Sequence, residues 1–200
     1  MMLRPLSHWR ALMERSWREE GGAQIVEFAV SLPLLVVFVV GIFDFSSAFT
    51  LKQKLTNAVR DAARTAAADP ASDLDLTTPA SVRDAFHIVE NYLTANNLDD
   101  CGLNLGAGPT DLTWTYTAST TGPPPCAITL IINRGYYFPQ TSTTAADCNA
   151  SQSGQVAVIA TCVSIQYAYQ WRFSRVISLL GASSTLPSNI TTTAVAVNEN

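Results

Sequence analysis

The chain has 200 residues, a formal net charge of −4 and 48% hydrophobic residues, enough sequence for one to one and a half domains. After residue 22 it carries 8 basic and 13 acidic residues, so it lacks the basic surface that binds nucleic acid. The two histidines, His8 and His87, lie far apart, and the four cysteines form no CxxC pair. We therefore expect neither a nucleic-acid partner nor a metal site.

Catalytic motifs are also missing from the sequence. It contains no GxSxG, no glycine-rich phosphate loop, no HExxH and no Cys–His constellation. The adjacent acids Asp99 and Asp100 fit a solvated turn better than an acid/base pair. We expect a protein that is not an enzyme and that uses no cofactor and no small-molecule substrate.

The N-terminal part begins with a charged leader, residues 1–22, which holds four arginines and three glutamates. Residues 28–43 then carry no charge and are interrupted only by Ser31, Pro33 and Gly41. At 1.5 Å per residue these sixteen residues span about 24 Å, and the flanking residues extend them to the ~30 Å of a bilayer core. We predict a transmembrane helix over 23–49 that continues as a helix over 50–68.

Glu27 is an acid near the start of this apolar segment. A charge inside a membrane costs on the order of a few kcal/mol and usually has a functional reason, although Glu27 at the interface can also simply snorkel into water. Ser46 to Ala48 would suit a signal-peptide cleavage site with a mature start at Phe49. Against that reading stand the length of the apolar run, the unbroken helical pattern past Ala48, and Glu27 itself.

Gly22, the four residues 23–26 and then Glu27-Phe28 resemble the processing motif of type IV prepilins of the Flp/Tad class. The resemblance implies that a prepilin peptidase cuts between Gly22 and Ala23, which leaves Glu27 as the fifth mature residue. Phe28 departs mildly from the pattern, because this family often has tyrosine there.

The wider segment, residues 21–68, resembles the N-terminal domain of TadE-like pseudopilins, the minor pilins of the tight-adherence system. The further matching features are Leu32-Pro33, Gly41-Ile42 and Ala63-Arg64. The resemblance implies three partners: the lipid bilayer, a prepilin peptidase and other Tad/Flp pilus subunits. It also implies a single-pass protein of the bacterial inner membrane, with its C-terminal domain outside the cytoplasm.

A physical role for Glu27 and Phe28 in subunit assembly follows from such cleavage. Cutting after Gly22 creates a free amine on Ala23, which Glu27 of the same chain or of a neighbour can neutralise among packed apolar helices. A wrong register would leave both charges unpaired, so the pair would also set the stagger between subunits. Pro33 removes one backbone hydrogen bond and is expected to kink the helix.

The remaining residues, 69–200, predict an extracytoplasmic α+β domain. Apolar residues at helical spacing continue the first helix as a core stripe: Leu51, Leu55, Val59, Ala62 and Ala66. After a loop at 68–80, Ser81 is expected to cap a second helix over 82–95, with His87 packed or on the surface.

Alternating patterns predict strands over 111–118, 127–133, 156–170 and 190–197, with a polar loop at 138–154. In the first strand Leu112, Trp114 and Tyr116 share the buried face. In the third, Cys162 points away from the face that carries Ile159 and Val163. The fold class is therefore α+β, with an antiparallel sheet against the outer half of a long helix.

The four cysteines, Cys101, Cys126, Cys148 and Cys162, all lie in this domain. Their even number in a Thr/Ser-rich region favours two disulfides in an oxidising compartment over four buried thiols in a cytosolic domain. Spacing leaves three connectivities open. Of these we favour Cys101–Cys126 with Cys148–Cys162, because Cys162 faces a side that a covering loop can reach.

Three functions are compatible with these patterns. The first is a TadE-like minor pilin that acts by assembly. The second is an extracytoplasmic binding or sensing module on an uncleaved membrane anchor, and the third is a protein released by signal peptidase. The basic residues do not fix the orientation, because four precede the span and four follow it within about twenty residues.

Overall fold

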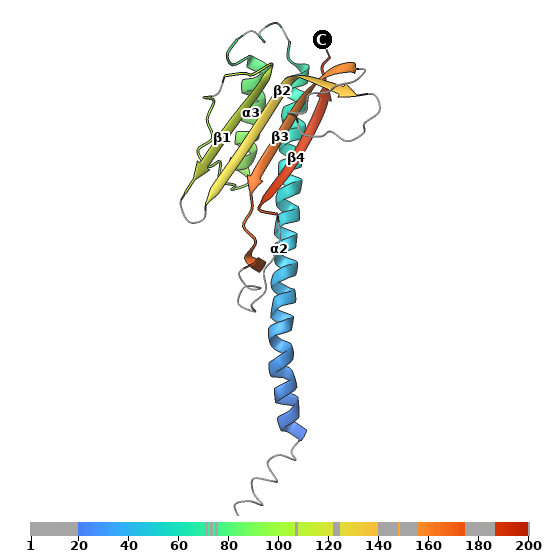
Figure 1. The fold of residues 1–200 in the computed structure, drawn as a ribbon, viewed down its shortest axis with the longest axis vertical. Coiled ribbons are helices and arrows are strands. Elements are labelled where there is room, and N and C mark those ends of the chain that lie inside the picture. Colours follow the sequence, from blue (N-terminus) through green and yellow to red (C-terminus); the bar gives the residue numbers. More distant parts are fainter. Residues whose placement is uncertain are drawn as a thin grey trace, which may run out of the picture. The chain divides into compact units, whose positions relative to one another are not determined.

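The computed structural model describes residues 20–70, 72, 74, 76–106, 108–121, 125–139, 148, 156–174 and 187–199. They form two long helices and a four-stranded sheet, which confirms the α+β fold (Figure 1). Most of the leader and most of the loop expected at 138–154 lie outside the described residues. The chain divides into two compact units, Met1–Phe45 with Arg172–Ser184 and Ser46–Trp171 with Thr185–Asn200.

Helix α2 (Glu20–Ala68) is one continuous helix of 49 residues, which runs through Pro33 without interruption. In its second half the predicted stripe of aliphatic and small residues is buried, as expected for a core stripe: Leu51, Leu55, Val59, Ala62 and Ala66. The small alanines allow close approach of the sheet and the second helix. This half of α2 is therefore a core helix of the second unit.

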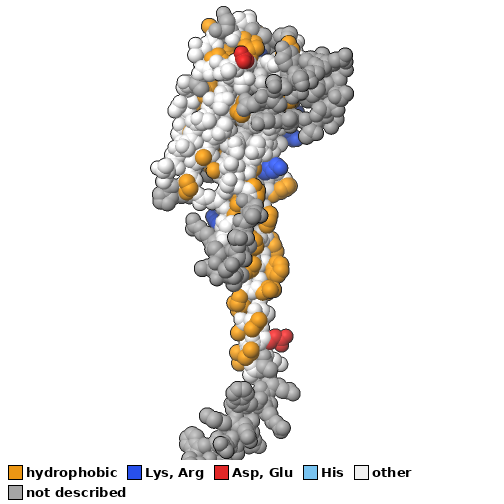
Figure 2. Space-filling view, viewed as in Figure 1, with side chains coloured by type: hydrophobic (Ala, Val, Ile, Leu, Met, Phe, Trp, Pro, Cys, Tyr) orange, Lys and Arg blue, Asp and Glu red, His pale blue; other side chains and the backbone are white. Residues whose placement is uncertain are grey.

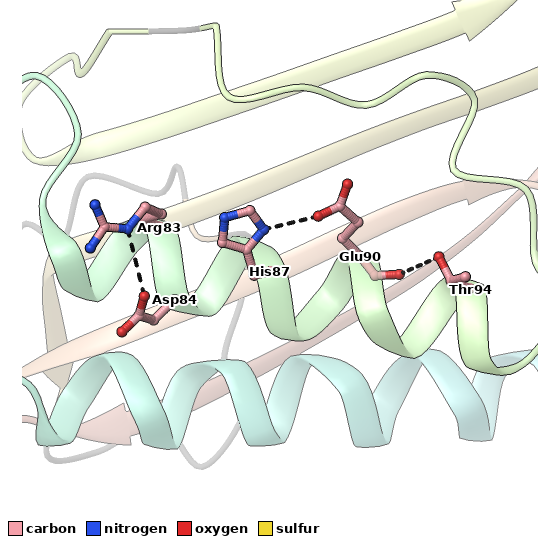
Figure 3. Close-up of polar contacts among 5 residues, drawn as sticks. All are labelled: Arg83, Asp84, His87, Glu90 and Thr94. Atoms are coloured by element: carbon pink, nitrogen blue, oxygen red, sulfur yellow. Dashed lines mark hydrogen bonds and ion pairs between the residues drawn. The ribbon is translucent and has the colours of Figure 1, made fainter.

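Helix α3 (Ala80–Ala95) buries one apolar face and exposes the other. Figure 3 shows polar contacts on its surface, including a bond of 2.9 Å between His87 Nδ1 and Glu90 Oε2. The expectation that Ser81 caps this helix is wrong. Pro79 is the N-cap, and Ser81 lies inside the first turn, where its buried hydroxyl has no partner among the described residues. The helix begins earlier than the pattern indicates because the proline already has the extended backbone that precedes a helix.

The strands β1 (Thr113–Thr120), β2 (Cys126–Pro139), β3 (Val156–Ala168) and β4 (Asn189–Val197) form an antiparallel sheet in chain order. Trp114 and Tyr116 point into the core, and burial raises the pKa of Tyr116 to about 12. Leu112 does not join them. It precedes β1 with a left-handed backbone (φ 62°) and is exposed, so its predicted burial is wrong.

The main core lies between one face of the sheet and the helices α3 and α2 (Figure 1). The opposite face carries a smaller cluster of five buried residues: Ile131, Tyr136, Cys148, Ala160 and Cys162. Cys162 therefore points away from the main core, as the alternation predicted. Ile159 lies four residues before Val163 on the same strand, as predicted, but it is exposed rather than buried in the main core.

The bulge is an irregularity of β2 that the sequence analysis missed. Between the pairs Asn133↔Cys162 and Tyr136↔Ala160, β2 uses one residue more than β3. Arg134 continues the alternation of Ile128, Leu130 and Ile132 toward the helices, and the extra residue then turns Tyr136 to the opposite face of the sheet. Gly135 permits this, since a Cβ there would stand 3.0 Å from the Leu112 side chain.

Arg134 is buried at the C-terminal end of α2. Its guanidinium donates hydrogen bonds to the carbonyl oxygens of Ala66 and Asp69 and to Thr161 Oγ1, the last two at 3.0 and 2.8 Å. The last carbonyls of a helix have no partner within it and carry partial negative charge, which a cation stabilises. Arg134 therefore closes the end of the long helix from the middle of the sheet.

The C-terminal residues join the same hydrogen-bond network. Thr161 donates to Asn198 Oδ1 at 2.6 Å, and Asn198 Nδ2 donates to the Arg134 carbonyl at 3.3 Å. The Glu199 amide donates to the Ala67 carbonyl at 3.4 Å. The end of β4 and the end of α2 are thus fixed to each other through Arg134.

Replacing this cation should destabilise the domain. Arg134→Met keeps much of the side-chain volume but leaves helix carbonyls without a donor, which should cost about 3 kcal/mol. In thermal unfolding of the full chain in detergent, followed by near-UV circular dichroism, the melting temperature should fall by roughly 6–12 °C. Arg83→Met is the matched control, because Arg83 is exposed on α3 and makes a weak surface ion pair with Asp84 at 3.8 Å. Equal melting of the two variants would contradict the role of Arg134.

Candidate functional site

The first half of α2 exposes many large apolar side chains, and Figure 2 shows hydrophobic side chains along the visible face of the helix. Fourteen large ones are exposed: Ile25, Val26, Phe28, Val30, Leu32, Leu34, Leu35, Val36, Phe38, Val39, Ile42, Phe43, Phe45 and Phe49. The helix is long and apolar enough to cross a membrane. A soluble helix would instead carry a polar face toward water. This segment is therefore a candidate membrane anchor.

Polar groups within this segment are few, and the helix itself satisfies one of them. Ser31 Oγ donates to the Phe28 carbonyl at 3.2 Å, a bond to the helix's own backbone. The two acids between residues 24 and 51 differ sharply in exposure: Glu27 is exposed, whereas Asp44 is buried. Glu27 is the acid that remains available to a partner outside the chain.

The predicted processing site lies at the beginning of α2. The described part of α2 includes Glu20 to Ala23, so the bond between Gly22 and Ala23 lies within helical backbone. Gly22 is exposed, and an added Cβ would meet nothing within 4 Å. Each of the two glycines weakens a helix by about 1 kcal/mol relative to alanine. The two glycines therefore lower the cost of unwinding the helix locally at this bond.

The helix brings the four predicted site residues together within two turns. Ala23 and Glu27 stand four residues apart, so they lie on the same face with an axial separation of about 6 Å. Phe28 follows Glu27 and is exposed as part of the apolar surface. An amine created at Ala23 would thus lie one turn from the Glu27 carboxylate.

The four cysteines form two disulfides in the second unit. Cys101 pairs with Cys126 and Cys148 with Cys162, with Cα atoms 5.5 and 5.6 Å apart, the pairing favoured from the sequence. The first joins the segment after α3 to the start of β2. The second fastens a residue of the β2–β3 connection to β3, where Asn133 Nδ2 also donates to the Cys148 carbonyl at 2.9 Å.

The acids beside the first disulfide form a turn. Asp99 Oδ1 accepts from the Cys101 amide at 2.8 Å, and Asp100 Oδ1 accepts from the Gly102 amide at 3.0 Å. Asp99 lies near the sulfur atoms of Cys101 and Cys126, but these are bonded to each other and offer no thiolate to a metal. The arrangement is that of a structural turn, in agreement with the reading from sequence.

Asp44 is a feature whose importance the sequence analysis missed. It lies directly after the uncharged run, and its Oδ2 accepts a hydrogen bond of 2.9 Å from the Phe173 amide. The available signal was an acid directly after an apolar run, three residues after a glycine. The distant partner in the β3–β4 connection could not be read from that spacing.

Comparison with known families agrees with this geometry. Residues 22–64 match the model of the TadE-like protein family, a stretch that begins at Gly22 and lies wholly within α2. The match is consistent with a TadE-like protein of Tad pilus systems. No curated protein and no solved structure is significantly similar to the chain.

The disulfides generate a direct prediction. Because all four cysteines are paired, alkylation of the native protein under denaturing conditions should modify no thiol before reduction and four after it. Mass spectrometry of protein from the native cell envelope measures this. The peptides should link residues 101 with 126 and 148 with 162, and four readily alkylated thiols would contradict the disulfides and the oxidising compartment.

Proposed function

We propose that the chain is a minor pilin of a Tad/Flp-type pilus or secretion apparatus. In this proposal residues 23–49 span the inner membrane, a prepilin peptidase removes the leader after Gly22, and the mature chain assembles with other pilus subunits. The observation that carries the proposal is α2 itself, a continuous helix that matches the TadE-like family from Gly22 onward and exposes its apolar first half.

The pairing of Glu27 with an amine gives the mechanism of assembly. In packed helices within a membrane, the ammonium of a mature Ala23 has no water to solvate it, and neither has the carboxylate of Glu27. The helical spacing lets the two meet within one chain or across neighbouring chains. A glutamate near the new helix N-terminus is also favoured by the helix dipole. Subunits in the wrong register would bury unpaired charges, so the pair selects one stagger.

The disulfides support an extracytoplasmic position for the second unit. Disulfides persist in oxidising compartments such as the periplasm and are rare in the cytosol. With the C-terminal domain outside, the leader is on the cytoplasmic side, and the orientation then rests on the disulfides, because basic residues are equally numerous before and shortly after the span.

An uncleaved anchor is the second candidate, and one observation favours it. The helix begins before Gly22, so the processing bond lies within regular helix rather than in an extended segment. In that case α2 holds the α+β domain at the membrane surface as a binding or sensing module. The two functions differ in the first residue of the mature chain.

Processing predicts the N-terminus directly. In cells that contain the matching peptidase, N-terminal sequencing should find a mature chain that starts at Ala23. Gly22→Val should abolish cleavage, since the bulky side chain stiffens the bond at the cut, whereas Gly21→Ala, one residue away, is the control and should be processed. An intact Met1 in the unsubstituted protein would support the anchor instead, and a start at Phe49 would support secretion.

Glu27 is predicted to act after insertion and cleavage. Glu27→Ala should still insert, because the span becomes more apolar, and should still be cleaved if the peptidase reads Gly22. Assembly should fail, since a buried amine without its counter-charge costs about 3–5 kcal/mol. Co-purification with other pilus subunits and electron microscopy of the cells measure assembly. Ser31→Ala is the matched control one turn further along the helix.

Normal pili in Glu27→Ala cells would mean that Glu27 only lies at the membrane interface, and they would refute the assembly mechanism. Loss of assembly together with loss of cleavage would instead place the defect at the peptidase step. Normal pili with Ser31→Ala are needed to exclude a general defect of the helix.

A further inference from the structure

The end of the apolar segment of α2 is covered by a short piece of the β3–β4 connection. Asp44 is only 4% exposed, although its neighbours Phe43 and Phe45 are 70% and 53% exposed. The Phe173 amide donates to Asp44 Oδ2 at 2.9 Å. The Phe173 ring packs on Gly41, where an added Cβ would stand 3.3 Å from the ring, so a larger residue would displace it. These contacts all lie within the first compact unit.

The sequence at and after this contact differs in composition from the strands. Residues 171–181 read WRFSRVISLLG, with two arginines, two aromatics and four large aliphatic residues. The strands around it carry mainly threonine, valine and alanine. Aromatic and arginine side chains mixed with aliphatic ones are typical of segments that lie in the interface of a membrane. Of the described residues of this piece, Arg172 is exposed and Phe173 is half-buried.

The place of the contact along α2 agrees with an interfacial position. Asp44 follows the uncharged run 28–43 directly, so it stands where a bilayer core ends and headgroups begin. A carboxylate facing lipid at this depth is costly. The amide of Phe173 and the cover of its ring take Asp44 out of contact with lipid.

We propose that Gly41 and Asp44 hold Phe173 against α2 so that Arg172 and Phe173 lie in the headgroup layer on the outer face of the membrane. Arg172 pairs with the phosphate of a lipid, which its planar guanidinium suits, and Phe173 enters the boundary with the acyl chains. The chain thus contacts the bilayer surface at a second place besides its span. This inference rests on the membrane span of the proposed function.

Lipid-attached quenchers test the contact in the full chain. A bimane label on Ser174→Cys preserves Arg172 and Phe173, and the native cysteines are already paired. The protein is reconstituted in vesicles of phosphatidylcholine and phosphatidylglycerol that contain a lipid with a nitroxide on its headgroup. Thr117→Cys, exposed on β1, is the control for the second unit, and Phe38→Cys with a mid-chain nitroxide reports on the span.

The expected result is strong quenching at residue 174 and little at 117. Asp44→Leu, which cannot accept the Phe173 amide, should lose most of the quenching at 174, while Asp44→Asn keeps an acceptor and should retain it. Equal quenching at 174 and 117 overturns the proposal, as does quenching that Asp44→Leu leaves unchanged. If 174 is unquenched in vesicles but shielded from an aqueous quencher in the assembled pilus, the surface belongs to a neighbouring subunit and the proposal is wrong. Absence of quenching at 38 would instead refute the membrane span of the proposed function.

Discussion

The rest of the structure depends on one constraint: the two halves of the single helix α2 have different surroundings. The second half of α2 buries its apolar stripe in protein, while the first half exposes fourteen large apolar side chains. Each such side chain left in water forgoes roughly 1.5–3 kcal/mol of burial free energy. The first half therefore needs an apolar environment that the described residues do not provide. A bilayer or a bundle of similar helices would provide it.

The second half imposes a requirement of another kind, because a helix that ends inside a domain must satisfy its last carbonyls. No basic residue lies in the last turn of α2 to do this locally. The cation comes instead from Arg134, at a bulge in the sheet, and is linked through Thr161 and Asn198 to the end of the chain. The sheet therefore covers the helix and also terminates it, which makes the C-terminal strand part of the same cooperative unit.

The spacing of apolar residues in the sequence was sufficient to predict those helices and strands in which buried residues recur at regular intervals. The stripe from Leu51 to Ala66, the buried face of α3 and the alternation of Trp114 and Tyr116 follow directly from 3.6- and 2-residue repeats. The extension of β2 past Asn133 was missed, since Arg134-Gly135 looks like the end of a strand. Only the pairing with β3 shows that these two residues form a bulge inside it.

The residues of the candidate site, too, could be predicted from the sequence only in part. Residues 22–28 are adjacent in sequence, so their spacing on a helix could be predicted without a structure. Asp44 and Phe173 are 129 residues apart, and no local pattern indicates that they meet. The disulfide pairing was predictable only in part. Alternation placed Cys162 on the face away from the main core, but only the fold brings Cys148 to it.

The account depends most on a direct contact between the Glu27 carboxylate and an amine created at Ala23, and zero-length cross-linking measures that contact. A membrane-permeant carbodiimide joins a carboxylate to an amine only when the two touch. Applied to assembled pili and followed by peptide mass spectrometry, it should yield an amide between Glu27 and an N-terminal amine, within the chain or with a neighbouring subunit. Recovery of Glu27 without any such linkage, alongside an N-terminal amine that remains free to acetylate, would contradict the account.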